Sequence, residues 1–271
     1  MDRRLTPFSG QVAHVSLKDR VRAERFTEGE PAAVAVPLAD LLSSPGGARD
    51  RQLLMGDAFL VIDRCDGHAF GQSAKDGYCG WLEEEALGSA AQPTHVVAVP
   101  ATHLYPEPRV QARELAGLSF GARVVVIGEA RNFLETTAGW CPAMHLRPVD
   151  APFDDPVEVA RLFFGTPYLW GGNSRAGIDC SGLAQAALLA CGIDCPGDSD
   201  LQQRIGTEVA ERDLRRGDLL FWKGHVAMAV DAERMIHATG YVMGVIEEEI
   251  AAAVARITAE GGGPVVARRR P

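Results

Sequence analysis

The pattern of apolar and polar positions divides the chain into three kinds of sequence. Residues 1–30 form a polar and charged lead-in segment, in which "LKDRVRAERF" is predicted to form a short helix. From residue 31 to about 150, short apolar runs alternate with turn residues, a pattern typical of strands and hairpins. Beyond residue 151, helical patterns come first and strand patterns follow, which favours an α+β domain over residues 151–271.

The β-rich region contains two similar phrases, "GDAFLVID…GYCGWL" and "GARVVVIG…TAGWCPA". In the first phrase, Asp66-Gly67 and Asp76-Gly77 are dipeptides typical of hairpin turns. We therefore expect two small all-β barrels, over residues 31–93 and 94–150. A single larger β-sandwich is the alternative.

Two helices are expected early in the last region. In "DPVEVARLFFG", Asp155 is a candidate N-cap before Pro156, and the helix should end at Gly165. A second helix is predicted from Cys180 to Ala190, stopped by Gly192. The later runs "DLLFW", "HVAMAV" and "RMIHAT" are separated by turns and predict an antiparallel meander.

Composition narrows the possible partners. The 271 residues carry a formal charge of −9, which argues against a nucleic-acid surface, and the basic tail "ARRRP" is expected to be frayed and solvated. We found neither an export signal nor a stretch of about 18 apolar residues, so we expect a cytoplasmic monomer that does not bind membranes. Six cysteines without a second ligand pair at zinc-finger spacing indicate neither a disulfide scaffold nor a metal site, and no cofactor is expected.

The candidate chemistry centres on Cys180, at the predicted start of a helix. The helix N-terminus favours a thiolate, although a lone cysteine is more often inert packing. Two histidines, His225 and His237, lie on neighbouring predicted strands, and antiparallel pairing would let both imidazoles point to the same side. Together the three residues could supply a nucleophile, a general base and a group that orients the base. The glycines of "WGGNSRAG" are expected to let a substrate approach the backbone closely.

These motifs resemble the signature of NlpC-type cell-wall cysteine peptidases. The matching stretches are "TPYLWGGNSRAGIDCSGL", "RRGDLLFWKGHVAMAV" and "MIHATG". The resemblance implies a papain-like fold with helices packed on an antiparallel sheet, with Cys180 as nucleophile, His225 as general base and His237 as the residue that orients it. It also implies that Tyr168 helps to line the oxyanion site. The two expected barrels are similar to bacterial SH3-like domains.

The combined arrangement resembles the γ-D-glutamyl-L-diamino acid endopeptidases. This resemblance implies a thiol protease of murein peptide recycling, whose substrates are short peptides with a free N-terminal L-Ala. Asp179 would then meet the substrate ammonium, Ser181 and Ser199 would bind the D-Glu carboxylate, and Tyr78 would close the pocket. The chain departs from the pattern at Gly197, where the family tends to carry an arginine, and "LLSSPGGARD" offers no clear glutamate for the amine site.

Alternatives remain open at this point. One is an inactive protein that binds cell-wall fragments, and another is an amidase or acyltransferase of the same fold. Elsewhere, Asp218 is expected to fix a turn. Core or cleft-wall packing is expected for the tryptophans, and core positions for the five other cysteines: Trp81, Trp140, Trp170, Trp222, Cys65, Cys79, Cys141, Cys191 and Cys195.

Overall fold

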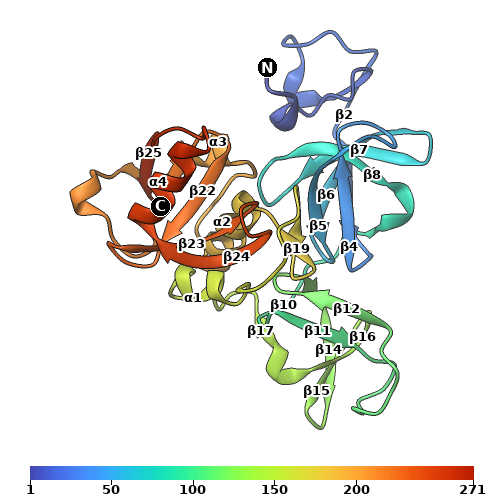
Figure 1. The fold of residues 1–271 in the computed structure, drawn as a ribbon. Helices are drawn as coiled ribbons and strands as arrows, with labels where there is room; N and C mark the ends of the chain where they lie inside the picture. Colours follow the sequence, from blue (N-terminus) through green and yellow to red (C-terminus); the bar gives the residue numbers. More distant parts are fainter. The chain divides into compact units, whose positions relative to one another are not determined.

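The computed structural model describes residues 1–271 and divides into two compact units, Met1–Ala151 and Pro152–Pro271 (Figure 1). The first unit begins with short elements, η1 (Arg3–Leu5), β1 (Val12–His14), η2 (Val15–Leu17) and β2 (Arg25–Thr27). The helix expected in "LKDRVRAERF" is absent. Its place is taken by turns and β2, because Asp19 adopts a positive φ of 66°, which an α-helix does not tolerate.

The first strand-rich part of this unit is a single seven-stranded sheet in the order β5-β4-β8-β7-β6-β3-β9. Its paired neighbours run antiparallel. Burial alternates along β4, so that Leu41 joins Phe59 and Leu82 in the core. The elements are β3 (Glu30–Val34), β4 (Leu38–Leu42), β5 (Arg49–Leu54), β6 (Ala58–Cys65), β7 (His68–Ser73), β8 (Cys79–Glu83), η3 (Glu84–Ala86) and β9 (Leu87–Ser89).

The second strand-rich part repeats much of this order. The two similar phrases form equivalent series, β6-β7-β8-η3-β9 and β14-β15-β16-η4-β17. Leu54 and Met55 pack with Val97 and Leu118 of the second part, so the two parts share apolar contacts. The elements are β10 (His95–Val97), β11 (Ala101–Leu104), β12 (Ala116–Ser119), β13 (Arg123–Val124), β14 (Val126–Ala130), β15 (Phe133–Thr136), β16 (Gly139–Pro142), η4 (Ala143–His145) and β17 (Leu146–Pro148).

The second unit is an α+β domain built on a six-stranded sheet in the order β20-β25-β21-β22-β23-β24. The predicted meander is confirmed, since β21, β22 and β23 pair antiparallel in sequence. Its elements are α1 (Pro156–Arg161), β18 (Asn173–Ser174), β19 (Gly177–Ile178), α2 (Cys180–Ala190), α3 (Ser199–Gln202), β20 (Thr207–Glu208), η5 (Glu211–Asp213), β21 (Leu219–Trp222), β22 (His225–Ala229), β23 (Arg234–Thr239), β24 (Gly244–Glu249), α4 (Ile250–Ala259) and β25 (Ala267–Arg270).

Helices cover both faces of this sheet (Figure 1). The helix α2 contacts β22 and β23 and has the predicted bounds. In α1, Asp155 caps the helix as expected, but the α-helix ends at Arg161 and turns continue to Gly165. The helix α4 was not predicted. Its Ala253 packs on the opposite face of the sheet, against a cluster that includes Trp222.

The basic tail is part of the sheet. Residues Ala267–Arg270 form β25, which pairs with β21 and β20. Arg270 lies 2.7 Å from a carboxylate oxygen of the buried Asp218, and Asp218 also accepts a hydrogen bond from the Arg215 N–H. The expectation of a frayed tail is therefore wrong, because backbone pairing and ion pairs hold it, whereas the turn role of Asp218 is confirmed.

Some expected core residues lie at the surface. The Trp170 side chain is 70% exposed, and Cys65 is exposed. By contrast, Trp81 and Trp222 are buried, as are Cys79, Cys141 and Cys195. None of the six cysteines forms a disulfide bond. None of the helices combines the length and apolar character needed to cross a lipid bilayer.

The glycines before α2 allow close packing within the protein. A Cβ atom on Gly182 would lie 2.6 Å from the Gly172 carbonyl oxygen, and one on Gly172 would lie 2.5 Å from the Gly177 oxygen. Gly171 has a φ of 70°, which glycine tolerates best. These glycines therefore let the loop lie directly on the start of the helix, whereas the sequence suggested that they make room for substrate.

This packing predicts the effect of Gly182→Ala. Overlap with the Gly172 backbone should outweigh the gain in helix propensity and lower the free energy of unfolding by about 1–3 kcal/mol. The matched control is Gly240→Ala, because Gly240 is exposed and has open space around its Cβ position. Urea unfolding followed by circular dichroism measures both variants. Equal stability of the two variants would contradict the packing argument.

Candidate active site

Cys180 is the first residue of α2. Asp179 is the N-cap, and its Oδ1 accepts a hydrogen bond of 2.6 Å from the Gly182 N–H. The Cys180 residue is only 7% exposed, and its sulfur interacts with the backbone N–H groups of Val226 and Ser181. Because Val226 follows His225 on β22, this contact brings the thiol to the start of the strand that carries the first candidate histidine.

The two candidate histidines are in direct contact. Strands β22 and β23 pair antiparallel with Met228 opposite Ile236. This register places His225 Nε2 2.8 Å from His237 Nδ1. The His237 side chain has no exposed surface, and its Nε2 lies 2.8 Å from Glu248 Oε1. The structure thus brings His225, His237 and Glu248 into one row, and it places the Cys180 sulfur beside the N–H of Val226, the residue that follows His225. The sequence analysis did not single out Glu248.

Burial is the main influence on the pKa values of Cys180 and His225. It raises the pKa of the Cys180 thiol to about 12, with a further contribution from the Asp179 charge, although nearby backbone N–H groups act in the opposite sense. Burial also lowers the pKa of His225 to about 3, with further lowering by His237 and Arg256. The free protein therefore holds a neutral thiol and a neutral imidazole. Desolvation and the Asp179 charge thus oppose the thiolate that the helix N-terminus favours.

Tyr168 lies close enough to Cys180 for the two groups to interact electrostatically. The residue is half-buried, and its backbone N–H donates to the Met243 carbonyl at 2.9 Å. Burial raises the pKa of the phenol, and the charges of Cys180 and Asp179 raise it further. The hydroxyl therefore keeps its proton at neutral pH and can donate a hydrogen bond, as a group lining an oxyanion site must.

Asp179 and Ser181 form part of the protein's own hydrogen-bond network. Besides the Gly182 bond, Asp179 Oδ1 accepts from Ser181 Oγ at 2.8 Å, and Oδ2 accepts from the Gly171 N–H at 2.9 Å. A hydroxyl has a single proton to donate. In the free protein the Ser181 hydroxyl donates its proton to Asp179, and its expected role as a donor to the D-Glu carboxylate stays a prediction.

Gln202 connects the nucleophile helix with the loop before α3. It is fully buried, and its Nε2 donates to the Ser181 carbonyl at 2.9 Å and to the Pro196 and Gly197 carbonyls at 3.0 Å. Gly197 thus contributes a backbone acceptor at the position where the family tends to carry an arginine. Ser199, 8% exposed, begins α3 in the same region. Sequence reasoning missed Gln202, since a glutamine in a polar segment gives no sign of burial.

Tyr78 belongs to the first unit, and we describe it there. The residue is 2% exposed and packs in the core cluster of the seven-stranded sheet. The Arg51 guanidinium carbon lies 5.6 Å from its ring centroid, a distance compatible with a cation–π contact. The ring is therefore held in one position by its own unit.

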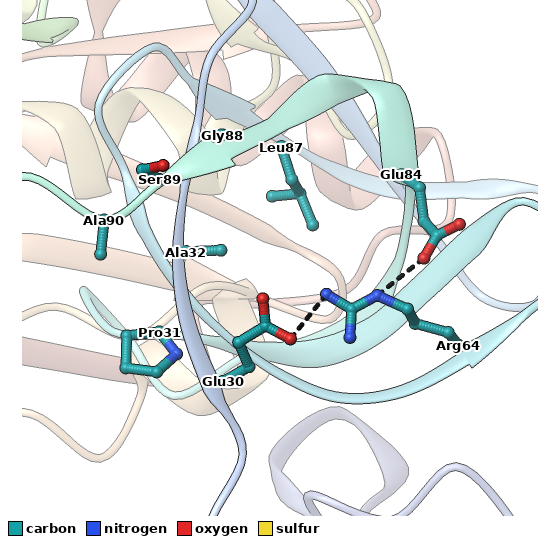
Figure 2. Close-up of a pocket in the computed structure, with 9 residues that line it drawn as sticks. All are labelled: Glu30, Pro31, Ala32, Arg64, Glu84, Leu87, Gly88, Ser89 and Ala90. Atoms are coloured by element: carbon teal, nitrogen blue, oxygen red, sulfur yellow. Dashed lines mark ion pairs between the residues drawn. The ribbon is translucent and has the colours of Figure 1, made fainter.

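The first unit also contains a pocket of about 290 Å³ lined by residues of β3 and β9 (Figure 2). Arg64 lies between two carboxylates there, 2.9 Å from Glu30 and 2.7 Å from Glu84. The two negative charges exceed the single positive charge, so the pocket has no excess positive charge for an anionic ligand. No group of three or more His, Cys, Asp or Glu side chains is arranged to hold a metal ion.

Two family models match the chain. The model of the NlpC/P60 family matches residues 165–256, which include Cys180, His225, His237 and Glu248. The model of the bacterial dipeptidyl-peptidase Sh3 domain matches residues 41–87. The first match falls in the second unit, and the second match falls on the seven-stranded sheet of the first unit.

Curated relatives come from several bacteria. A gamma-D-glutamyl-L-lysine dipeptidyl-peptidase of Bacillus cereus is 29% identical over 223 residues, which cover 70% of this chain and 67% of the relative. The protein of the same name from Bacillus subtilis is 29% identical over 188 residues, covering 61% of this chain and 62% of the relative. Dipeptidyl-peptidase 6 of Lysinibacillus sphaericus is 37% identical over 187 residues, covering 60% and 69%.

Solved structures show the same fold. A crystal structure of an NlpC/P60 family protein from Bacillus cereus superposes with a TM-score of 0.75 at 23% identity, covering 89% of this chain and 99% of that one. An NlpC/P60 endopeptidase from Photobacterium damselae gives 0.61 at 14% identity, covering 88% and 72%. On the sequence relatives and this likeness of fold, the chain belongs to the NlpC/P60 peptidase family and carries a bacterial SH3 domain before its peptidase-family domain.

Proposed function

We propose that the protein is a cysteine peptidase that hydrolyses the γ-D-glutamyl–diamino acid bond of short murein peptides. The observation that carries this proposal is the contact of 2.8 Å between His225 Nε2 and His237 Nδ1, with the Cys180 sulfur beside the N–H of Val226. The names of the Bacillus relatives support the choice of bond. A dipeptidyl-peptidase acting on this bond would release the N-terminal dipeptide L-Ala-γ-D-Glu.

The proposed reaction proceeds through an acyl-enzyme. His225 takes the thiol proton as the Cys180 sulfur attacks the γ-carbonyl carbon of D-Glu. The Cys180 N–H and the Tyr168 hydroxyl donate hydrogen bonds to the developing oxyanion. The protonated His225 then gives its proton to the departing amine of the diamino acid, which breaks the C–N bond. A water, deprotonated by His225, hydrolyses the thioester and restores the thiol.

Neutral resting groups suit this reaction. A thiol and an imidazole cost less to bury than two separate charges, and proton transfer between them creates an ion pair only when the substrate is present. The backbone N–H groups of Ser181 and Val226 then stabilise the thiolate, since each lowers the pKa of Cys180. His237, whose Nδ1 lies 2.8 Å from His225 Nε2, holds the His225 ring in position while its imidazolium forms.

Asp179 is the residue that we propose binds the free amine of the substrate. Three hydrogen bonds already engage Asp179. An ionised carboxylate has about four acceptor positions, so one position on Oδ2 remains for the ammonium of the N-terminal alanine. We propose that Ser199 donates to the D-Glu carboxylate, and the role expected for Tyr78 stays a prediction.

We also infer finer features of the fold and setting. The repeated element order suggests that the second strand-rich part is another SH3-like barrel, and the helix that carries the cysteine on an antiparallel sheet suggests a papain-like arrangement. A requirement for a free N-terminal amine would restrict the enzyme to peptides already released from glycan. This restriction favours a cytoplasmic monomer that recycles murein peptides.

The substrate proposal predicts a strict requirement for the amine. The peptide L-Ala-γ-D-Glu–diamino acid should be cut to L-Ala-γ-D-Glu and the free diamino acid, and the N-acetylated peptide should react at least about 100-fold more slowly, because it has lost a charged partner. Mass spectrometry of the products measures both rates. Equal cleavage of the two peptides would refute the amine site, and cleavage of neither would refute the substrate.

Cys180→Ala is the control for the nucleophile in the same assay. It should lower kcat by at least about 10³-fold, because no other group can form the acyl intermediate. Cys191→Ala, which removes a half-buried thiol on the far end of the same helix, should retain activity. Activity in Cys180→Ala would move the reaction to another residue.

The raised pKa of Cys180 predicts how the thiol reacts with iodoacetamide. A thiol with a pKa of about 12 is protonated at neutral pH, so its thiolate fraction should rise about tenfold per pH unit from pH 6 to pH 9. Peptide mass spectrometry follows labelling of Cys180, with urea-unfolded protein as the reference for an ordinary thiol. A labelling rate that stays constant between pH 5 and pH 8 would instead show a resting thiolate–imidazolium pair.

A further inference from the structure

Glu248 and Arg256 extend the row of candidate catalytic groups beyond His237. Glu248 lies near the end of β24, and its Oε1 is 2.8 Å from His237 Nε2 and 2.5 Å from Arg256 Nη2. Arg256 comes from α4, stacks 4.0 Å over the Tyr241 ring and lies 3.7 Å from Glu260. The side chains of Glu248 and Arg256 are 18% and 17% exposed, so the ion pair is largely sheltered from solvent.

Strand register places these groups on one face of the sheet. Met235 pairs with Glu248 across β23 and β24, and His237 pairs with Ile246. Because side chains alternate along a strand, His237 and Glu248 project from the same face as diagonal neighbours. The other acidic side chain at this point, Glu247, projects from the opposite face and pairs with Arg161 at 2.6 Å.

We propose that Glu248 is a positioning residue that fixes the tautomers of both histidines, leaving Nδ1 of His225 as the base for the Cys180 thiol. His237 Nε2 is buried without a hydrogen bond of regular geometry, and the Glu248 Oε1 atom lies 2.8 Å from it. This assignment rests on the proposed cysteine-peptidase reaction.

The tautomers of His237 and His225 follow from the Glu248 carboxylate, which lies beside His237. The contact with His237, together with the Arg256 charge, lowers the pKa of Glu248, so its carboxylate is ionised at neutral pH and only accepts hydrogen bonds. Neutral His237 must then carry its proton on Nε2, and its Nδ1 becomes an acceptor. His225 must in turn donate from Nε2, because 2.8 Å separates that atom from His237 Nδ1.

The same chain of contacts acts when the base becomes charged. His225 has Nδ1 unprotonated and can receive the thiol proton there, becoming an imidazolium. The Glu248 charge raises the pKa of His225, opposing the effects of burial, His237 and Arg256, and therefore favours that imidazolium. Arg256 holds Glu248 in place through an ion pair. Its positive charge also lowers the pKa of His225 and so offsets part of the effect of Glu248.

The first test reads the tautomers in the free protein, by ¹⁵N NMR of histidine-labelled protein assigned through single histidine substitutions. Wild type and Glu248→Gln should show Nε2–H on both His225 and His237, since the amide oxygen of glutamine also accepts. Glu248→Ala should populate the Nδ1–H form of both rings. The matched control Glu247→Gln removes the neighbouring carboxylate and should leave the tautomers unchanged.

The second test measures turnover of the free-amine tripeptide. Glu248→Ala should lower kcat by about 10- to 100-fold with KM nearly constant, because the residue acts through the base and not on the substrate. Glu248→Gln should recover part of the loss, and Glu247→Gln should match wild type. If Glu248→Ala does not fold, the test rests on Glu248→Gln, which has a similar shape. Its activity should then be lower than that of Glu247→Gln, and equal activities would contradict the inference.

The two tests separate this inference from the substrate proposal. If no variant cuts the tripeptide but the tautomers behave as expected, the substrate is wrong and the role of Glu248 stands. An Nδ1–H form of His237 in wild type would overturn the inference. The inference would also be overturned if the tautomers or the kcat of Glu248→Ala matched those of Glu247→Gln.

Discussion

The site depends on one carboxylate that joins a loop to the start of a helix. Asp179 accepts from Gly171 in the loop at 2.9 Å and from Gly182 in α2 at 2.6 Å. Without this cap, the first turn of α2 would have unpaired N–H groups in a buried environment, at a cost of about 1–3 kcal/mol for each lost bond. The same two bonds hold Cys180 in a fixed orientation between the loop and β22.

This capping has an electrostatic consequence for the nucleophile. A helix N-terminus attracts an anion, but the capping carboxylate is itself an anion next to Cys180 and contributes to the raised pKa of the thiol. Fixing the helix and activating the thiol therefore oppose each other. In the proposed reaction the thiolate is generated through His225, which makes the precise protonation of the two imidazoles more important than the helix dipole.

The sequence predicted local elements well where a single physical signal decided them. The Asp155–Pro156 cap, the bounds of α2 and the antiparallel meander follow from capping residues and apolar spacing. Residues that depend on distant partners were harder to predict. Arg270 forms an ion pair with Asp218, and the buried Gln202 donates hydrogen bonds to three backbone carbonyls. Glu248 becomes important only because strand register brings it next to His237.

The glycine-rich motif before α2 has a different structural role from the one that the sequence suggested. In the sequence, "WGGNSRAGIDCSG" suggested open space for a substrate. In the structure, the Cβ positions of Gly172, Gly177 and Gly182 are filled by the protein itself. A loop packed this closely cannot shift without moving the first turn of α2, so the motif fixes where the thiol stands relative to β22. Such placement serves the proposed reaction, because misplacement of a nucleophile by about 1 Å can cost about 10²-fold in rate.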